Sequence, residues 1–111
     1  YWDILNHPGV DSFDLAKIKD NMRLGISGGA AMPVELLKRF EEKFGVTILE
    51  GSGLSETSPT ATFNRMDRPR KVGSIGLPVW GVEVRVVDDE MNDVAVGEAG
   101  EVVIRGHNIM K

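Results

Sequence analysis

One amphipathic segment between two short apolar runs limits the fold more than any other feature of this chain. Residues 33–44 read PVELLKRFEEKF, with apolar residues spaced to share one helical face and charged residues on the other. Pro33 suits a first turn, where its missing N–H would have no partner, and Gly45 suits the left-handed residue after a last turn. Strand-forming runs precede and follow this segment, at residues 21–26 (NMRLGI) and 46–50 (VTILE). Strand, loop, helix and strand in this order predict a parallel α/β unit.

The two predicted helices are expected to bury specific residues. On the long helix the expected inner face comprises Val34, Leu36, Leu37, Phe40 and Phe44. A shorter helix is expected to begin after a cap at Ser12 or Asp14 and to place Leu15 and Ile18 on one face.

The last forty residues have a different pattern. Residues 72–81 (VGSIGLPVWG) are rich in glycine, and residues 82–88 (VEVRVVD) alternate apolar and charged side chains, which predicts a half-buried strand. An acidic turn and a glycine-bent link lead to residues 101–105 (EVVIR), a further strand. The fold class expected for the whole chain is therefore α/β, a partial parallel sheet with a flanking helix followed by a β-rich antiparallel segment. The expected division between the two parts lies near residues 65–72, where the sequence RMDRPRK is polar and interrupted by proline.

Composition excludes several classes of function. A formal net charge of -4 disfavours a nucleic-acid binder, which needs a dominant basic surface. The absence of cysteine excludes disulfides, thiolate catalysis and zinc-thiolate sites, and fits a reducing compartment, so a cytoplasmic location is expected. No apolar stretch approaches the ~18 residues of a membrane-spanning helix. The chain starts at Tyr1 and stops at Lys111 soon after a strand, so we expect a piece of a longer protein.

A serine hydrolase is one interpretation of the motifs. The sequence GISGG around Ser27 matches G-x-S-x-G, and the order Ser27, then Asp88 or Asp93, then His107 fits a catalytic triad. The nucleophile turn of that fold needs a helix that begins at the serine, however, and five residues separate Ser27 from Pro33. The match is therefore kept only as an alternative.

Two other charged segments are expected to be surface loops. Asp88, Glu90 and Asn92 imitate the first ligands of a calcium loop, but Asp93 and Ala99 stand where that loop needs glycine and glutamate. The basic cluster, interrupted by an aspartate and a proline, comprises Arg65, Arg68, Arg70 and Lys71.

Two loops of small residues carry the stronger signal. Residues 27–32 (SGGAAM) and 51–59 (GSGLSETSP) each follow the C-terminal end of an expected parallel strand, the edge at which open α/β sheets bind ligands. Their small side chains leave backbone N–H groups free for anions, and Glu56 is a lone carboxylate among hydroxyls that suits Mg²⁺ beside phosphate. Together the loops predict a nucleotide site.

Four segments in order, SGGAAMP, EGSGLSETSP, VGSIGLPVWGVEVRVVD and GEVVIRGHNIMK, resemble the large domain of adenylate-forming enzymes. They are most similar to bacterial long-chain fatty-acid–CoA ligases. The resemblance implies that a fatty acid attacks ATP to give acyl-adenylate, and that CoA then displaces AMP, with Mg²⁺ as cofactor. It implies no nucleic-acid partner and no transmembrane segment, and it leaves room for peripheral contact with a membrane. An aryl-CoA ligase or an amino-acid adenylation domain is the alternative within the superfamily. Outside it, the alternatives are the serine hydrolase that uses Ser27 and His107 and a non-catalytic interaction module.

The resemblance also assigns roles to residues. Gly28, Gly29 and Ala30 would wall the adenine and the acyl entrance. The nucleotide contacts that it implies beyond these are Glu50, Gly51, Ser52, Gly53 and Ser55. Ser55 and Glu56 would be the catalytic pair, the hydroxyl bonded to phosphate oxygens and the carboxylate bound to Mg²⁺. Residues 1–68 would belong to an α/β subdomain that binds nucleotide and acyl group, and residues 69–111 to a β-rich subdomain.

Two departures from the family pattern stand out. Ser52 occupies a position where the family has an aromatic residue stacked on adenine, and such stacking is worth about 1–3 kcal/mol by analogy with nucleic-acid binders. The family's upstream phosphate loop, its ribose-binding aspartate and its C-terminal-domain lysine have no counterpart in these residues. We therefore expect the 111 residues alone neither to adenylate a fatty acid nor to hold ATP tightly.

Overall fold

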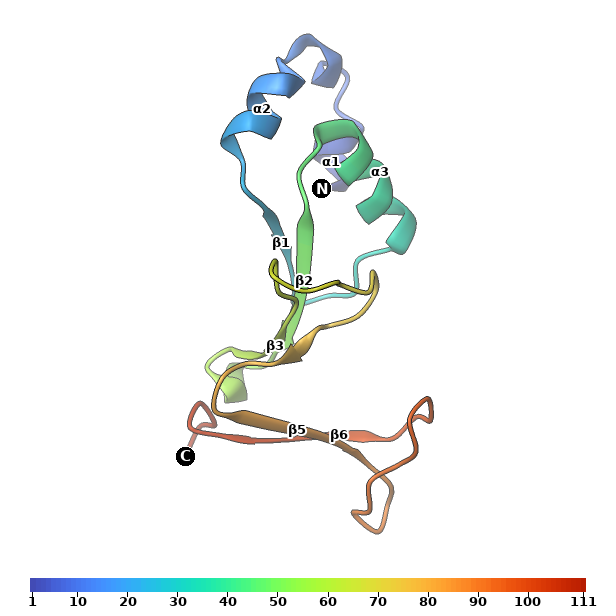
Figure 1. Ribbon diagram of the computed structural model, residues 1–111, viewed down its shortest axis with the longest axis vertical. Coiled ribbons are helices and arrows are strands. Elements are labelled where there is room, and N and C mark those ends of the chain that lie inside the picture. The colour runs from blue at the N-terminus through green and yellow to red at the C-terminus, as the bar shows by residue number, and fades with distance from the viewer.

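Two separate sheets and three helices make up the molecule (Figure 1). The computed structural model describes all residues, Tyr1–Lys111. The helices are α1 (Trp2–Leu5), α2 (Leu15–Asn21) and α3 (Val34–Phe44), with 3₁₀ turns η1 (Val10–Ser12) and η2 (Ser55–Thr57). The first sheet has the order β1-β2-β3-β4, formed by β1 (Gly25–Ser27), β2 (Ile48–Gly53), β3 (Thr60–Phe63) and β4 (Leu77–Pro78). The second sheet pairs β5 (Val82–Val87) with β6 (Glu101–Gly106). Only β1 and β2 are parallel, so the predicted class, a partial parallel sheet with a flanking helix and then antiparallel β, is confirmed.

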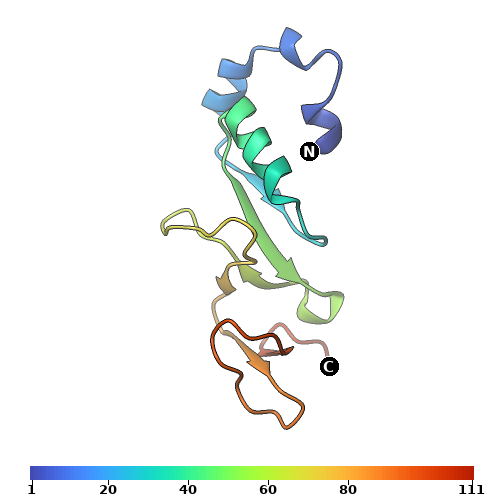
Figure 2. The same ribbon diagram turned by 90° about the vertical axis from the view of Figure 1, so that its right-hand side faces the viewer.

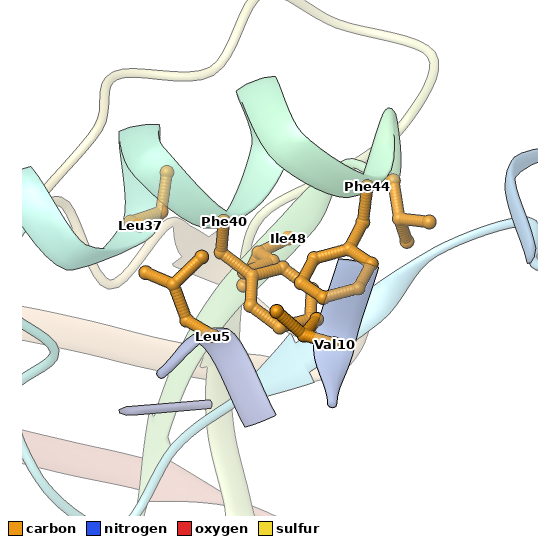
Figure 3. Packing of buried hydrophobic residues seen from close by; sticks show 7 residues of the cluster. Leu5, Val10, Leu37, Phe40, Phe44 and Ile48 are labelled. Carbon is orange, nitrogen blue, oxygen red and sulfur yellow. The ribbon is translucent and has the colours of Figure 1, made fainter. Parts of the chain in front are cut away.

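The long helix α3 supplies the core, as its pattern predicted. Leu37, Phe40 and Phe44 are buried and point toward Leu5, Val10 and Ile48, which come from three other elements or turns (Figure 3). Burial of each such side chain contributes roughly 1.5–3 kcal/mol relative to exposure. Gly45 ends the helix with φ 65°, the left-handed conformation expected of it.

Val34 is the one residue of the predicted inner face that leaves the core. It is 38% exposed and lies at the first turn of α3, where the side chain reaches toward Gly73 instead. The shorter helix α2 begins after Asp14, whose carboxylate accepts a hydrogen bond from the Lys17 N–H at 3.0 Å. Leu15 and Ile18 pack against the core, as predicted.

Strand β2 is longer than its sequence suggested. It continues from Ile48 through Gly53, so the first residues of the expected loop are strand. Its first half pairs with β1, Ser27 opposite Glu50, and its second half pairs with β3, Gly51 opposite Phe63. No strand was predicted at β3. The glycines permit this close pairing, because a Cβ on Gly51 would lie 2.3 Å from the Phe63 ring.

Where β3 no longer pairs with β2, a side-chain ion pair forms hydrogen bonds with the backbone of β2. The Glu41 carboxylate accepts a hydrogen bond from the Ile48 N–H at 2.6 Å, and Arg70 donates to the Ile48 carbonyl at 3.0 Å and to Glu41. The two charged side chains are only 20% and 21% exposed. Arg70 therefore differs from the surface residue predicted for its basic cluster, because the loop that carries it folds back over α3.

The β5–β6 hairpin is regular, with pairing from Val82 opposite Gly106 to Val87 opposite Glu101. The predicted alternation fails at its end, where Val87 is fully buried and Val86 is 37% exposed. The cause is the connecting loop, which folds back and donates the Val94 N–H to the Val86 carbonyl at 3.0 Å.

The two sheets form an elongated body rather than a sphere (Figure 2). Its extents are 55 × 28 × 25 Å and its radius of gyration is 16.9 Å, against about 13 Å for a compact chain of about 100 residues. Apolar side chains consequently stay exposed, among them Trp80 at 94%. None of the helices combines the length and apolar character needed to cross a membrane.

Candidate functional site

Two cavities lie against the C-terminal halves of β1 and β2. We name them after one residue of each. The Glu50 cavity, of about 420 Å³, is lined by Ser27, Gly29, Ala30, Ala31, Met32, Glu50, Gly51, Ser52, Gly53, Leu54, Gly73 and Ile75. The Phe63 cavity, of about 320 Å³, is lined by Ile26, Ser27, Gly28, Gly29, Gly51, Ser52, Gly53, Pro59, Thr60 and Phe63.

The two cavities share a wall made of backbone. Successive side chains of a strand point to opposite faces, so Glu50 and Gly51 face opposite ways, and Phe63, paired with Gly51, lies on the Gly51 face. Each cavity accordingly occupies one face of the same strand. A Cβ on Gly28 would lie 3.2 Å from the Gly51 carbonyl oxygen, so glycine allows β1 and β2 to meet without intervening side chains. Ligands on the two faces would be separated by little more than a peptide plane.

Glu50 holds one side of its cavity in place. Its carboxylate accepts a hydrogen bond from the Gly73 N–H at 2.8 Å, across the cavity from β2. Its carbonyl accepts from the Asn64 N–H and from Asn64 Nδ2, at 2.9 Å and 3.0 Å. Asn64 Nδ2 also reaches the Ser74 carbonyl, so residues 73 and 74 are fixed to the strand at two points.

Ser55 and Glu56 lie on the turn η2 beyond the end of β2, and they line neither the Glu50 cavity nor the Phe63 cavity. Both residues are exposed. The structure thus brings together Gly28, Gly29, Ala30 and the strand residues Glu50 to Gly53, and leaves the predicted catalytic pair at the margin of that group.

Thr57 fixes the turn from within. Its side chain is buried, and its Oγ1 accepts from the Leu54 N–H at 2.9 Å and donates to the Pro59 carbonyl at 2.5 Å. Sequence reasoning missed Thr57 and Asn64, because a buried polar residue inside a polar loop leaves no periodic signal.

The geometry does not assemble the hydrolase alternative. Ser27 lies in the shared wall of the cavities, whereas His107 follows β6 and lies beside Gly81. Asp88 follows Val87 and Asp93 pairs with Val87, so both acids lie at the end of β5 away from His107. The five steps from Val82 to Val87, at ~3.4 Å each, separate the two ends by about 17 Å. In a Ser-His-Asp triad the histidine side chain must contact both the serine and the aspartate.

The chain contains no cluster of three or more His, Cys, Asp or Glu side chains that could hold a metal ion. A metal at the predicted position would have one carboxylate of the chain, that of Glu56, and oxygen atoms of its ligand. That donor set fits Mg²⁺, which usually binds one or two carboxylates together with phosphates and water.

A third hollow, about 420 Å³ and apolar, is lined by residues of the three helices and of the segment between α1 and α2. It is lined by Asp3, Ile4, His7, Val10, Phe13, Ile18 and Phe44. Its walls contain none of the residues predicted for the site.

Comparison with known proteins gives one consistent family. Residues 2–111 match the model of the family described as AMP-binding enzyme. The long-chain-fatty-acid–CoA ligase of Bacillus subtilis (strain 168) is 37% identical over 112 residues, which is 100% of this chain and 19% of the relative. The Yersinia pestis ligase of the same name is 42% identical over 89 residues, 80% of this chain and 16% of the relative. The chain therefore spans about a fifth of the length of these curated relatives.

Among solved structures, an anthranilate CoA ligase in complex with anthranoyl-AMP matches with a TM-score of 0.82 and 34% identity. The match covers 96% of this chain and 20% of that one. A long-chain-fatty-acid-CoA ligase from Archaeoglobus fulgidus also matches, with a TM-score of 0.64 and 28% identity, so this fold is found within larger ligases named for aryl and for fatty acids.

Proposed function

The chain belongs to the family of AMP-binding enzymes, and from this premise we propose that the protein containing it is an ATP-dependent long-chain fatty-acid–CoA ligase. The proposed reaction has two steps. The acid carboxylate attacks the α-phosphate of ATP and releases pyrophosphate, and the CoA thiol then attacks the acyl carbon and releases AMP. The observation that carries the proposal is the pair of cavities divided by backbone, because the first step needs two different substrates to meet.

We assign the nucleotide to the Glu50 cavity and the acid to the Phe63 cavity. The Glu50 cavity contains a carboxylate, two serines and backbone groups of the 29–32 loop, which suits a polar ligand. The Phe63 cavity has Ile26, Pro59 and Phe63 in its wall, which suits an alkyl or aryl group. Gly51, which lines both cavities, and Gly28, which lies against it, are the proposed meeting place of carboxylate and α-phosphate.

Ser55 and Glu56 are proposed to contact the phosphates. Their turn follows β2 directly, and their side chains are exposed and free to reach a ligand that extends from the Glu50 cavity. Mg²⁺ would neutralise charge on the phosphates, and Glu56 would hold it. The Ser55 hydroxyl would donate a hydrogen bond to a phosphate oxygen.

Ser52 offers no ring on which adenine could stack. The aromatic ring nearest to it in the two linings, Phe63, belongs to the opposite face of β2. We therefore expect the affinity for ATP to be lower by about 1–3 kcal/mol than with an aromatic residue at this position. The variant Ser52→Tyr, compared with the unaltered protein by calorimetric titration of ATP, tests this expectation.

The proposed function is tested on the protein expressed from its complete reading frame, by acid-dependent exchange of pyrophosphate into ATP. Fatty acids of increasing length, benzoate, anthranilate and ferulate are compared. We expect the highest kcat/KM with long-chain fatty acids. Faster exchange with an aryl acid would instead identify an aryl-CoA ligase, the alternative that the anthranilate ligase structure favours. Exchange with none of these acids would contradict the proposal.

Glu56→Gln in that protein separates the two half-reactions. Loss of the carboxylate is expected to slow adenylation by about 100-fold, the effect of removing one electrostatic group from a polar transition state. Transfer from preformed acyl-adenylate to CoA is expected to change much less, because pyrophosphate has already left. Glu42→Gln, an exposed carboxylate on α3, is the matched control. Equal loss in both half-reactions would argue against a metal-binding role for Glu56.

The subdomain boundary, the inactivity of the isolated residues and the cellular location are further parts of the proposal. The division into subdomains at residues 68 and 69 stays a prediction, as does the inactivity of the 111 residues alone. A cytoplasmic location is supported by the absence of cysteine. Calorimetry on the 111-residue piece tests the inactivity prediction, and sub-micromolar binding of ATP would contradict it.

A further inference from the structure

The turn that carries Ser55 and Glu56 is held from outside by the segment after β6. Asn108 Nδ2 donates to the Thr57 carbonyl at 2.7 Å and to the Thr60 carbonyl at 2.8 Å. The Met110 N–H donates to the Glu56 carbonyl at 2.9 Å. Residues about fifty positions apart in the chain are thereby joined at three points.

The amide of Asn108 is suited to this position by its chemistry. Both of its partners are carbonyl oxygens, so only the NH₂ end of the side chain can face them, and it uses both hydrogens. Asn108 Oδ1 is buried on the other side without a hydrogen-bond partner. An aspartate here would place carboxylate oxygens against two carbonyls, and an alanine would leave both carbonyls without their donor.

Both contacts of Asn108 lie on the C-terminal side of Glu56, at the end of the turn and at the start of β3. Thr57 directly follows Glu56, and its buried hydroxyl already fixes the turn to Leu54 and Pro59. Thr60 begins β3, which pairs with β2 at Gly53. Asn108 thus links the turn to the start of β3, and without it the Glu56 backbone would keep only the Met110 contact from this segment.

From this geometry we propose that Asn108 is a positioning residue for adenylation, which orients the Glu56 carboxylate by holding the backbone of its turn. Asn108 itself touches no substrate. The proposal rests on the function proposed above for Glu56. The segment after β6 would then contribute to adenylation. It lies within the residues that match the family, but the predicted ligase site contained none of its residues.

The test is a double-mutant cycle on the protein expressed from its complete reading frame. Four forms are compared by acid-dependent pyrophosphate exchange: unaltered, Asn108→Ala, Glu56→Gln, and both together. We expect Asn108→Ala to lower the kcat of exchange by about 10- to 100-fold and to have less than about a twofold further effect in the Glu56→Gln background, because both changes act through one carboxylate. We also expect Asn108→Ala to raise the Mg²⁺ concentration for half-maximal rate about fivefold or more, with the KM for the acid changed less than about threefold.

Two further variants complete the design. Asn21→Ala removes an amide that donates to a backbone carbonyl within its own helix α2, and is expected to leave exchange unchanged. Asn108→Ser retains one donor and is expected to lose less than Asn108→Ala, which provides a second measurement if the alanine variant does not fold. Thermal melting establishes that each variant compared is folded.

The outcomes separate the two proposals. No exchange by the unaltered protein would overturn the proposed function itself. If the unaltered protein catalyses exchange, two results would overturn the positioning role of Asn108 and leave the proposed function standing. One is that Asn108→Ala lowers the rate by the same factor with and without Glu56→Gln. The other is that Asn108→Ala leaves the Mg²⁺ requirement unchanged.

Discussion

Two regions of this molecule contain paired strands but are stabilised in different ways: residues 33–53, with α3 and β2, and residues 82–106, with the β5–β6 hairpin. In the first region, apolar side chains of α3 cover the strand, and Leu37 and Ile48 are completely buried. In the second region the pairing is longer and more regular, yet Val102 is 53% exposed and only two residues of the strands are buried. Regular hydrogen bonding therefore does not identify the part of the chain that contributes most to stability.

The ion pairs of the two regions repeat this contrast. Arg70 and Glu41 are about four-fifths buried and bond to the backbone of β2. Arg105 and Glu83 form a cross-strand pair at a similar distance, 2.6 Å, with side chains 82% and 64% exposed. Water screens the second pair and not the first, so the same chemistry should have different energetic weight.

The largest expected difference comes from truncating one apolar side chain in each region. Leu37→Ala should lower the free energy of unfolding by about 3 kcal/mol, because it leaves a cavity under α3. Val102→Ala should cost only about 0.5 kcal/mol, the scale of an exposed cross-strand pair with Val86. Urea unfolding of both variants measures the two values. Similar losses would show that another surface covers the Val102 face in the protein from the complete reading frame.

A smaller difference is expected from replacing one arginine in each region by methionine. Arg70→Met leaves Glu41 partly buried without its cation and removes the donor to the Ile48 carbonyl, which should cost about 2 kcal/mol. Arg105→Met should change stability by less than about 0.5 kcal/mol. Raising the salt concentration should weaken the Arg105 contribution first. An equal cost at both positions would mean that burial does not separate the two pairs.

The smallest expected effect is the pH response of the hairpin loop. The N–H of Asn92 bonds to the Asp88 carboxylate and lowers the pKa of Asp88 below its usual 3.8, with further help from the Asn92 side chain and the Glu90 N–H. A lowered folded-state pKa means that this contribution is complete above pH 3.8 and is lost as the pH falls through the lower value. NMR titration of the Asp88 carboxyl carbon, assigned with Asp88→Asn, measures it. A midpoint at or above 3.8 would contradict the expectation.

The elements that sequence predicted well are those whose signal is local. The periodicity of residues 33–44 and the cap of α2 each depend on neighbours within one or two turns. The long helix was located correctly, and of the two predicted caps, Ser12 or Asp14, the structure has Asp14. Strand β3 and the extension of β2 depend on pairing between Gly51 and Phe63, and glycine has no strand preference of its own. Arg70 was misplaced for a related reason, because its burial depends on a loop closing over α3.

The same distinction between local and long-range signals applies to the candidate site. Small residues after two strands predicted a shared edge, and the structure brings Gly28 and Gly51 into contact there. Order along the chain could not indicate that Glu56 lies on a turn beyond the cavities, since that depends on the 3₁₀ turn closed by Thr57. Asn108 could not be associated with this turn at all, because 51 positions separate it from Thr57.

The two side chains that bond to the backbone N–H and carbonyl of Ile48 affect self-association of the protein. A strand whose backbone N–H and C=O groups are unpaired on one side is a template for another chain, and β3 ends before it can cover this part of β2. Glu41 and Arg70 occupy those two groups and place a full ion pair where an incoming strand would have to lie. The Glu41–Arg70 ion pair therefore disfavours aggregation by strand addition at this edge of β2.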